Sequence, residues 1–292
     1  MMEIRADEPM AKHVTWRAGG RVAKACFPHD LKDLAAFLAT LRHDEPLLMV
    51  GLGSNLLIRD GGFDGTAVFT HGALDELRQE SGGALYAEAG VAAPKIARFA
   101  ANHGLAGAEF LAGIPGTLGG ALAMNAGCHG SELWQFVERV LMLDRAGNLV
   151  ERLPADFAVG YRHVGLKAAS DEIFAAAWLR FPPGDGAAAR ARIRALLEKR
   201  IATQPLSLPN AGSVFRNPPG DHAARLIEAA GLKGAESGGA RVSEKHANFI
   251  VNPAGGANAS AIESLIGRIQ AEVFEQFGVE LVREVRILGA GK

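Results

Sequence analysis

The stretch LLMVGLGSNLLIRD, residues 47–60, decides the fold. It begins as a short apolar run and passes into a glycine turn, a pattern that favours a buried strand ending at a ligand. In the turn GLGSN, residues 51–55, two glycines let the backbone approach a ligand closely. The serine and the asparagine add short polar groups and consecutive N–H donors, which can hold a diphosphate. Read alone, GxGSN is equally well an ordinary turn at the end of a strand.

A second glycine segment lies at GIPGTLGG, residues 113–120, and is followed by NAG, residues 125–127. It places five glycines within fifteen positions. Because each glycine adds to the entropy lost on folding, we expect a reason beyond packing within the protein. Close approach of the backbone to a large flat cofactor, such as an isoalloxazine ring, is one such reason. A glycine-rich structural loop is the alternative.

The remaining elements mix strands and helices without regular alternation, which predicts an α+β fold rather than a doubly wound sheet. Pro94 opens an amphipathic helix that ends near Gly104, and a longer helix runs from Ile262 to Phe277 and is closed by Gly278. Apolar or alternating runs predict strands, one pair forming a hairpin, at TAVFTHG (66–72), ALYAEAG (84–90), VERVLMLDRAGNLVERL (137–153), EIFAAAWLRF (172–181) and VELVREVRIL (279–288). Neither GxGxxG nor GxxxxGK[ST] is present, which argues against dinucleotide-fold and P-loop proteins.

Bulk composition narrows the class of partner. Lys plus Arg number 31 against 32 Asp plus Glu, so the net charge of −1 gives no general attraction to nucleic acid or anionic lipid. Cys26 and Cys128 cannot build a disulfide framework or a four-ligand zinc site and suit a reducing compartment, so we expect no metal and a cytoplasmic location. Neither a signal peptide nor a run of about 18 apolar residues is found, so no membrane contact is expected. The expected partner is a small molecule.

Four motifs in a fixed order carry a resemblance. GLGSN, AGIPGTLGG (112–120) and MNAG (124–127) are similar to the PCMH-type FAD-binding domain of the vanillyl-alcohol-oxidase-like flavoproteins. More closely, the chain resembles the UDP-N-acetylenolpyruvoylglucosamine reductase family, from about Thr15 to Gly289, and TWRAGG (15–20) is similar to the N-terminal element of that family. The resemblance implies an FAD-binding domain of two α+β subdomains, residues 1–75 and 76–183, and a C-terminal α+β substrate-binding domain, residues 184–292. PPGDG, residues 182–186, is the natural last boundary because it interrupts both periodicities.

The resemblance also implies a reaction and a cofactor site. Such an enzyme uses NADPH, through bound FAD, to reduce UDP-N-acetylglucosamine enolpyruvate to UDP-N-acetylmuramate in peptidoglycan precursor synthesis. We expect it to act as a monomer. The implied cofactor contacts are Gly51, Leu52, Gly53, Ser54, Asn55, Leu56, Gly113, Ile114, Pro115, Gly116, Thr117, Gly119, Gly120, Asn125, Ala126, Gly127 and Ile173.

Reduction of an enolpyruvyl ether requires hydride at the terminal methylene carbon and a proton at the adjacent carbon, so the site needs an acid and a cationic group. By resemblance, Arg162 in GYRHVG holds the substrate carboxylate, Ser213 in NAGSVFRNP donates the proton, and Glu284 in EVR assists. The implied substrate contacts are Tyr161, Arg162, Lys199, Asn217 and His246. Without the resemblance, the three catalytic candidates have simpler interpretations, as a surface arginine, a turn serine and an exposed strand glutamate.

The sequence departs from the family pattern at two places. Arg216 stands where relatives more often have lysine, and a planar fork binds phosphate differently from a point charge. No YxQxP tyrosine loop occurs between the strand at Glu172 and the NAGSVF segment, so the chain resembles the shorter subtype of the family. The sequence therefore does not identify the element that closes over the UDP group.

Two other functions stay open at this point. The first is a flavin-dependent oxidase or dehydrogenase of a hydroxylated sugar, which needs a base rather than a late proton donor. The second is a nucleotide-binding module whose glycine loops hold a ligand without turnover.

Overall fold

The computed structural model describes residues 2–168 and 170–291, which form two compact units. Unit 1 contains the described residues within Met1–Arg5, Ala25–Gly51 and Thr66–Lys199. Unit 2 contains those within Ala6–Lys24, Leu52–Gly65 and Arg200–Lys292. The three-part division expected from the sequence stays a prediction, and its first and last residues, 1 and 292, lie outside the described residues.

The centre of unit 1 is an antiparallel sheet with the strand order β11-β10-β14-β7-β6. Its strands are β6 (Leu77–Gln79), β7 (Leu85–Glu88), β10 (Val137–Leu143), β11 (Leu149–Arg152) and β14 (Ile173–Leu179). The predicted hairpin is therefore confirmed as β10 and β11, whose turn contains Gly147 at φ +84°. The predicted strands at ALYAEAG and EIFAAAWLRF are confirmed as β7 and β14.

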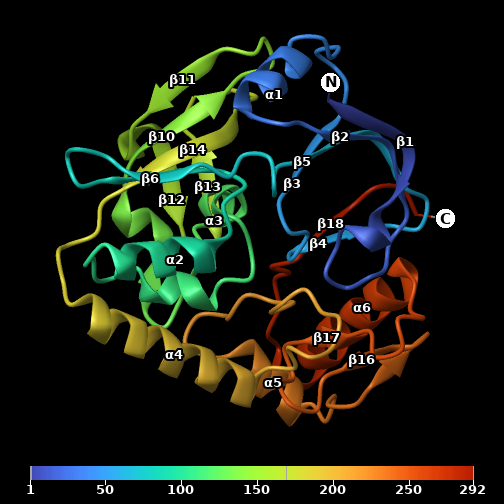
Figure 1. The fold of residues 1–292 in the computed structure, drawn as a ribbon. Helices are drawn as coiled ribbons and strands as arrows, with labels where there is room; N and C mark the ends of the chain where they lie inside the picture. The colour runs from blue at the N-terminus through green and yellow to red at the C-terminus, as the bar shows by residue number, and fades with distance from the viewer. Residues whose placement is uncertain (1, 169, 292) are drawn as a thin grey trace. The chain divides into compact units, whose positions relative to one another are not determined.

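Two helices cover one face of this sheet, α2 (Ala93–Asn102) and α3 (Leu118–Met124) (Figure 1). Side chains alternate along β14, so Ala177 and Leu179 join the core beneath these helices while Ala176 and Trp178 belong to a cluster with Tyr86. Pro94 lies in the first turn of α2 and Gly104 follows its end at φ +67°, as predicted. The sheet and the helices together fix the position of the second glycine segment, which enters α3.

The other elements of unit 1 are shorter. α1 (Leu31–Leu38) packs beside the parallel pair β3 (Leu47–Val50) and β5 (Phe63–Phe69), and the hairpin β12 (Phe157–Gly160) and β13 (His163–Leu166) precedes β14. Two short strands, β8 (Gly127–Cys128) and β9 (Ser131–Glu132), pair with each other. The remaining segments are the 3₁₀ turns η2 (Glu109–Gly113), η3 (Leu133–Phe136) and η4 (Pro154–Asp156), and α4 (Gly186–Thr203), which follows PPGDG. The boundary between the units falls within α4, β5, β1 (Glu3–Pro9) and β2 (Arg21–Phe27).

Unit 2 is organised around α6 (Ala259–Phe277). Asn258 caps its N-terminus through a side-chain bond to the N–H of Ala261, and Gly278 ends it at φ +66°. Its apolar face, which includes Ile262, Leu265 and Ile269, shares one hydrophobic core with residues of β4 (Leu56–Ile58), α5 (Ala223–Ala229), β16 (Ala240–Val242) and β17 (Ile250–Val251). The other elements of the unit are η1 (Met10–Lys12), β15 (Glu236–Ser237) and β18 (Arg286–Leu288).

The strand predicted at 279–288 is wrong in its length, because only β18, its last three residues, is a strand. β18 pairs in parallel with β4. The preceding residues make an isolated bridge between Phe215 and Arg283 instead of a ladder. The α+β fold class itself is confirmed, since helices and mostly antiparallel strands, with the parallel pairs β3–β5 and β18–β4, follow one another without regular alternation.

Candidate functional site

The two glycine segments meet in unit 1. β3 ends at Val50, and a Cβ placed on the following Gly51 would overlap the hydroxyl of Thr117 and lie 2.9 Å from its Cγ2. Thr117, which is 2% exposed, is the N-cap residue of α3. Further along, the N–H of Gly119 donates to the carbonyl of Ala89 at 2.8 Å, and a Cβ on Gly119 would lie 2.9 Å from the Cβ of Ala89. The backbone at Gly51 therefore lies against the side chain of Thr117, more than sixty residues away in sequence, and Gly119 lies against the backbone of Ala89.

These contacts correct one step of the sequence argument. We expected the glycines of both segments to reflect the approach of a cofactor. At Gly51, Gly53, Gly113, Gly119 and Gly127 the space for a Cβ is instead filled by other parts of the protein. Protein packing is therefore sufficient to explain these five glycines, because no larger residue fits the observed backbone separations.

A different observation fits a bound FAD. The N–H groups of residues 51–55, and those of Gly116 and Thr117, donate no hydrogen bond to any of the residues that the structure describes. Gly53 and Thr117 are nevertheless buried. Buried N–H groups are rarely left without an acceptor, and consecutive ones form an anion-binding nest. Donors of this kind suit the phosphate oxygens and ring acceptors of a dinucleotide cofactor, so each segment, taken by itself, fits FAD.

Two of the predicted catalytic residues lie close together in unit 2. The N–H of Glu284 donates to the carbonyl of Val214 at 2.8 Å, and Val214 directly follows Ser213. On the other side, the N–H of Arg216 donates to the carbonyl of Val282 at 2.9 Å. Ser213 and Glu284 are both partly exposed, whereas Val214 is buried. The hydroxyl and the carboxylate therefore belong to adjacent backbone segments that are held in register.

The GLGSN loop supports both of these segments. The Asn55 side-chain amide donates to the carbonyl of Glu284 at 3.2 Å, and the main-chain carbonyl of Asn55 accepts from the N–H of Arg286 at 3.1 Å. Thr15 donates through its N–H to the carbonyl of Gly53 at 3.1 Å and through its hydroxyl to that of Asn210 at 2.5 Å. Any shift of this loop is consequently transmitted to the backbone on either side of the serine and the glutamate.

Arg162 lies in unit 1, in the two-residue turn between β12 and β13. It adopts φ +54°, which is unusual for a long side chain. Its guanidinium donates to the carbonyls of Asn125 at 3.3 Å and Gly127 at 2.6 Å, and it lies over the ring of Tyr161 at 4.8 Å. Tyr161 is itself 47% exposed. The turn therefore presents a fixed cation beside the end of the second glycine segment.

The other predicted contacts have varied surroundings. Ile173 begins β14 and packs on the cluster that contains Leu34 and Leu143, and Lys199 is exposed on α4. Asn217 is exposed, and its side-chain oxygen accepts from the N–H of Ala223 at 3.1 Å. None of these three observations decides a ligand contact, so the three assignments stay predictions.

Neither His246 nor Arg216 has surroundings that mark it as a cationic ligand contact. The His246 ring packs on Phe249, its Nδ1 accepts from the N–H of Asn248 at 3.3 Å, and burial lowers its pKa. A contact from His246 would therefore be made by the neutral imidazole. Arg216 has a buried Nε without a hydrogen bond among the described residues. The Nε of Arg139, which stacks on Trp178, also makes no hydrogen bond there, although Glu151 Oε2 lies 3.4 Å away. That feature alone consequently does not mark a phosphate contact.

Comparison with known proteins gives the family. A model of the UDP-N-acetylenolpyruvoylglucosamine reductase C-terminal domain matches residues 204–288, and a model of an FAD binding domain matches residues 22–152. The UDP-N-acetylenolpyruvoylglucosamine reductases of Thiobacillus denitrificans and Alkalilimnicola ehrlichii are 56% and 57% identical, over 97% and 98% of this chain and 91% and 95% of theirs. The chain belongs to the UDP-N-acetylenolpyruvoylglucosamine reductase family.

A solved structure agrees with this membership. The UDP-N-acetylenolpyruvylglucosamine reductase of Thermus caldophilus superimposes with a TM-score of 0.83 at 29% identity, over 98% of this chain and 99% of that one. The resemblance stated from the motifs and the predicted FAD-binding domain are thereby confirmed. The roles of individual residues are not tested by these comparisons. Because Arg162 lies in unit 1 and Ser213 and Glu284 lie in unit 2, their joint action stays a prediction.

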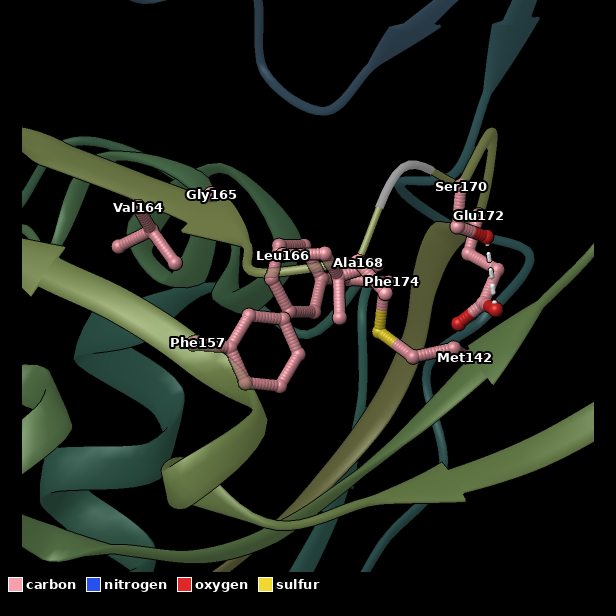
Figure 2. Close-up of a pocket in the computed structure, with 9 residues that line it drawn as sticks. All are labelled: Met142, Phe157, Val164, Gly165, Leu166, Ala168, Ser170, Glu172 and Phe174. Carbon is pink, nitrogen blue, oxygen red and sulfur yellow. Dashed lines mark hydrogen bonds between the residues drawn. The ribbon is translucent and has the colours of Figure 1, made fainter.

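A cavity of about 230 Å³ is lined in part by residues of β12 and β13 (Figure 2). Its lining residues are Met142, Phe157, Val164, Gly165, Leu166, Ala168, Ser170, Glu172 and Phe174. Glu172, the charged residue of this set, accepts from Ser170 at 2.8 Å and pairs with Arg152 at 2.6 Å. A cavity whose charged lining group is a carboxylate does not suit a diphosphate, and none of the predicted site residues is among the described residues that line it.

No helix among the described residues is long and apolar enough to cross a membrane. Within the same residues, no three His, Cys, Asp or Glu side chains are grouped so that they could hold a metal ion.

Sequence reasoning missed two polar residues that support the site. Thr15 lies in TWRAGG, a motif that was noted, although its hydroxyl was not expected to reach Asn210. Glu132 contacts the side chain of Asn125 at 2.8 Å and lies in no motif that the sequence analysis used. Only the chain's path through α3, β8 and β9 brings Glu132 there, so no local pattern could have found it.

Proposed function

We propose that the chain reduces the enolpyruvyl ether of UDP-N-acetylglucosamine enolpyruvate to UDP-N-acetylmuramate, with NADPH as reductant and FAD as cofactor. Family membership over nearly the whole chain supports the reaction, and the open N–H donors of both glycine segments support the cofactor. We further propose a cytoplasmic monomer, in keeping with two cysteines that form no disulfide in the described residues. The step consumes a UDP-sugar and makes a peptidoglycan precursor.

The observation that carries the proposal is the register between Ser213 and Glu284. Bound FAD supplies hydride transfer to the terminal methylene carbon. The adjacent carbon then needs a proton, and Ser213 is the proposed donor. A serine hydroxyl is a weak acid, so it requires a neighbouring group that favours proton loss and restores the proton afterwards. Glu284, bonded to Val214 next to that serine, is suitably located for this task.

Arg162 supplies the cationic part of the mechanism. The substrate carbon that receives the proton carries a carboxylate, whose charge rises as the enolate-like species develops. A guanidinium held by two backbone carbonyls needs little reorganisation to stabilise that charge. Arginine is well suited to this role because its planar fork can bind a carboxylate through two parallel hydrogen bonds.

Separate measurement of the two half-reactions tests the proposal. In anaerobic stopped flow, NADPH should bleach the flavin and the enolpyruvyl sugar should restore its colour. Ser213→Ala should leave bleaching within about twofold of wild type and slow recolouring by about 10²- to 10⁴-fold, the range for loss of a general acid. Ser264→Ala, the same change on the exposed face of α6, should affect neither step.

Three outcomes would contradict the proposal. Equal loss of both steps in Ser213→Ala would indicate damaged flavin binding rather than a lost proton donor. A colourless protein that cannot be loaded with FAD would support a binding module without turnover. Rapid oxygen consumption with a hydroxylated sugar and no NADPH would support the oxidase alternative.

A further inference from the structure

Arg162 is supported by a polar cluster in unit 1 that its reaction chemistry does not require. The cluster consists of Asn125, at the end of α3, and Glu132, in β9. Asn125 Nδ2 donates to Glu132 Oε2 at 2.8 Å and to the carbonyl of Gly160 at 3.2 Å, and Gly160 is the last residue before the turn. The main-chain carbonyl of Asn125 accepts from the Arg162 guanidinium at 3.3 Å. Asn125 therefore binds both the base and the tip of the catalytic turn.

Both amide N–H donors of Asn125 are used within the protein. Its Oδ1 accepts from the N–H of Trp134 at 3.2 Å, and its two donor contacts go to Glu132 and Gly160. The residue is only 2% exposed. An amide with these two donor contacts has no N–H left for a cofactor unless one of them is broken. The donors of this asparagine in the MNAG motif therefore serve the protein.

Glu132 adds an electrostatic contact to the same cluster. Its Oε1 lies 3.7 Å from Arg162 Nη1, while Oε2 binds Asn125. The Arg162 side chain is 15% exposed and that of Glu132 is 34% exposed, so solvent screens the pair only in part. At 3.7 Å the carboxylate is too distant for a strong hydrogen bond. It orients the guanidinium by its charge and leaves the N–H donors of Arg162 available to a substrate carboxylate.

Backbone conformation shows that this arrangement is strained. Arg162 has φ +54° and Asn125 has φ +43°. Asparagine adopts a left-handed conformation readily at the end of a helix, whereas the same conformation costs about 1–2 kcal/mol at an arginine. A residue such as Arg162 keeps it only where the surroundings determine it, and strain of this kind gathers at functional sites. The hydrogen bonds of Asn125 and the guanidinium bonds of Arg162 supply that determination.

We propose that Asn125 and Glu132 are positioning residues for Arg162, which fix the guanidinium for the substrate carboxylate and make no side-chain contact with the cofactor. This inference rests on the proposed function of Arg162. It adds that the order of the catalytic turn depends on an asparagine amide and a carboxylate from a different part of unit 1. The consequence is a defect confined to the sugar half-reaction when either group is removed.

Three variants separate the contributions. Asn125→Gly removes the amide and keeps a residue that tolerates positive φ. Glu132→Ala removes the carboxylate, and Glu132→Gln keeps an oxygen that can accept from Asn125 Nδ2. Glu138→Gln is the matched control, because Glu138 pairs with Arg180 at 3.0 Å elsewhere in unit 1. Each protein is checked for thermal unfolding, FAD content, the Kd of the enolpyruvyl sugar from the flavin absorbance change, and both half-reaction rates.

We expect Asn125→Gly and Glu132→Ala to slow flavin reoxidation by the sugar by about 10- to 100-fold and to weaken sugar binding, since misplacement by about an ångström has effects of this order. Flavin reduction by NADPH should stay within about twofold of wild type. Glu132→Gln should recover most of the loss, and Glu138→Gln should match wild type. If Asn125→Gly fails to fold, the two Glu132 variants give the same test at a partly exposed residue.

Arg162→Ala distinguishes failure of this inference from failure of the proposed function. If Arg162→Ala reoxidises slowly while Asn125→Gly and Glu132→Ala reoxidise at the wild-type rate, the positioning role is overturned and the function stands. If Arg162→Ala reoxidises at the wild-type rate, the proposed role of Arg162 fails and this inference fails with it. Loss of FAD in Asn125→Gly with wild-type FAD content in Glu132→Ala would assign Asn125 to the cofactor and overturn the proposal.

Discussion

The contact between Gly51 and Thr117 gives a quantitative test of how the two glycine segments meet. In Gly51→Ala the new Cβ would overlap the Thr117 hydroxyl and lie 2.9 Å from Cγ2, where ordinary contact begins at 3.4 Å. The methyl group would have to retreat by about 0.5 Å and the hydroxyl further. Thr117 is buried, β-branched and fixed at the start of α3, so it has few ways to move. Overpacking of this kind destabilises by about 1–3 kcal/mol.

Removal of the Thr117 side chain should relieve most of that strain. In Gly51→Ala with Thr117→Ala, the closest remaining atom is the Cβ of residue 117 at 3.1 Å, which is only a few tenths of an ångström too near. The double variant should therefore be more stable than the sum of the single changes predicts. We expect a coupling free energy of about 1–2 kcal/mol in favour of the double variant, within the range seen for residues in contact.

Urea unfolding followed by circular dichroism and by flavin fluorescence measures the four proteins of this cycle. Gly82→Ala is the control, because no atom lies within 4 Å of its Cβ position and its φ is not left-handed. That substitution should change the free energy of unfolding by less than about 0.5 kcal/mol. Effects of Gly51→Ala and Thr117→Ala that add within about 0.3 kcal/mol would refute the reasoning, because independent effects mean that the segments do not touch.

Three further results are expected. Asn55→Ala should slow flavin reoxidation by the sugar by about tenfold, because it removes the bond to the carbonyl of Glu284, while flavin reduction by NADPH stays unchanged. Burial raises the pKa of Glu88, so above about pH 4.5 the folded state binds more protons than the unfolded state and the wild-type protein loses stability as the pH rises. Glu88→Gln lacks this proton, so its free energy of unfolding relative to wild type should rise between about pH 4.5 and 7, as measured by urea unfolding at each pH. Asp60→Ala should lower the unfolding free energy of unit 2 by about 1–2 kcal/mol, because Asp60 accepts two N–H groups in the first turn of α6, with Asp64→Ala as the control.

Much of the fold was predictable because the relevant signals are local. Pro94 and Gly104 mark the two ends of α2, and Gly278 ends α6, since each residue acts through its own backbone conformation. The predicted strands follow from apolar runs bounded by turns. The exception is the segment 279–288, where the apolar pattern continues although only three residues pair as a strand. Whether a partner strand continues is a non-local fact that the pattern does not contain.

The site was predictable in part, and for a different reason. Motif order predicts Arg162, Ser213 and Glu284 as catalytic residues, which stays a prediction, and the structure adds that the last two are held in register by a bond between Glu284 and Val214. The glycine argument predicts two segments as cofactor contacts, which also stays a prediction, and part of its reason was wrong. A sequence shows that a side chain is missing, but it does not show whether protein or cofactor occupies the space. At Gly51 and Gly119 that space is filled by Thr117 and Ala89.

Asn55 and Asn125 explain why polar residues end both glycine segments. The N–H groups of residues 51–55 and of Gly116 and Thr117 are open to a ligand, while the two asparagine side chains turn to the protein, one toward Glu284 and the other toward the turn of Arg162. A loop built in this way links two requirements, because a segment proposed to hold the cofactor also fixes a proposed catalytic group. Replacing either asparagine should then leave flavin binding largely intact and impair the step that needs Arg162 or Glu284. An asparagine suits this task because it offers a donor and an acceptor without adding a buried charge.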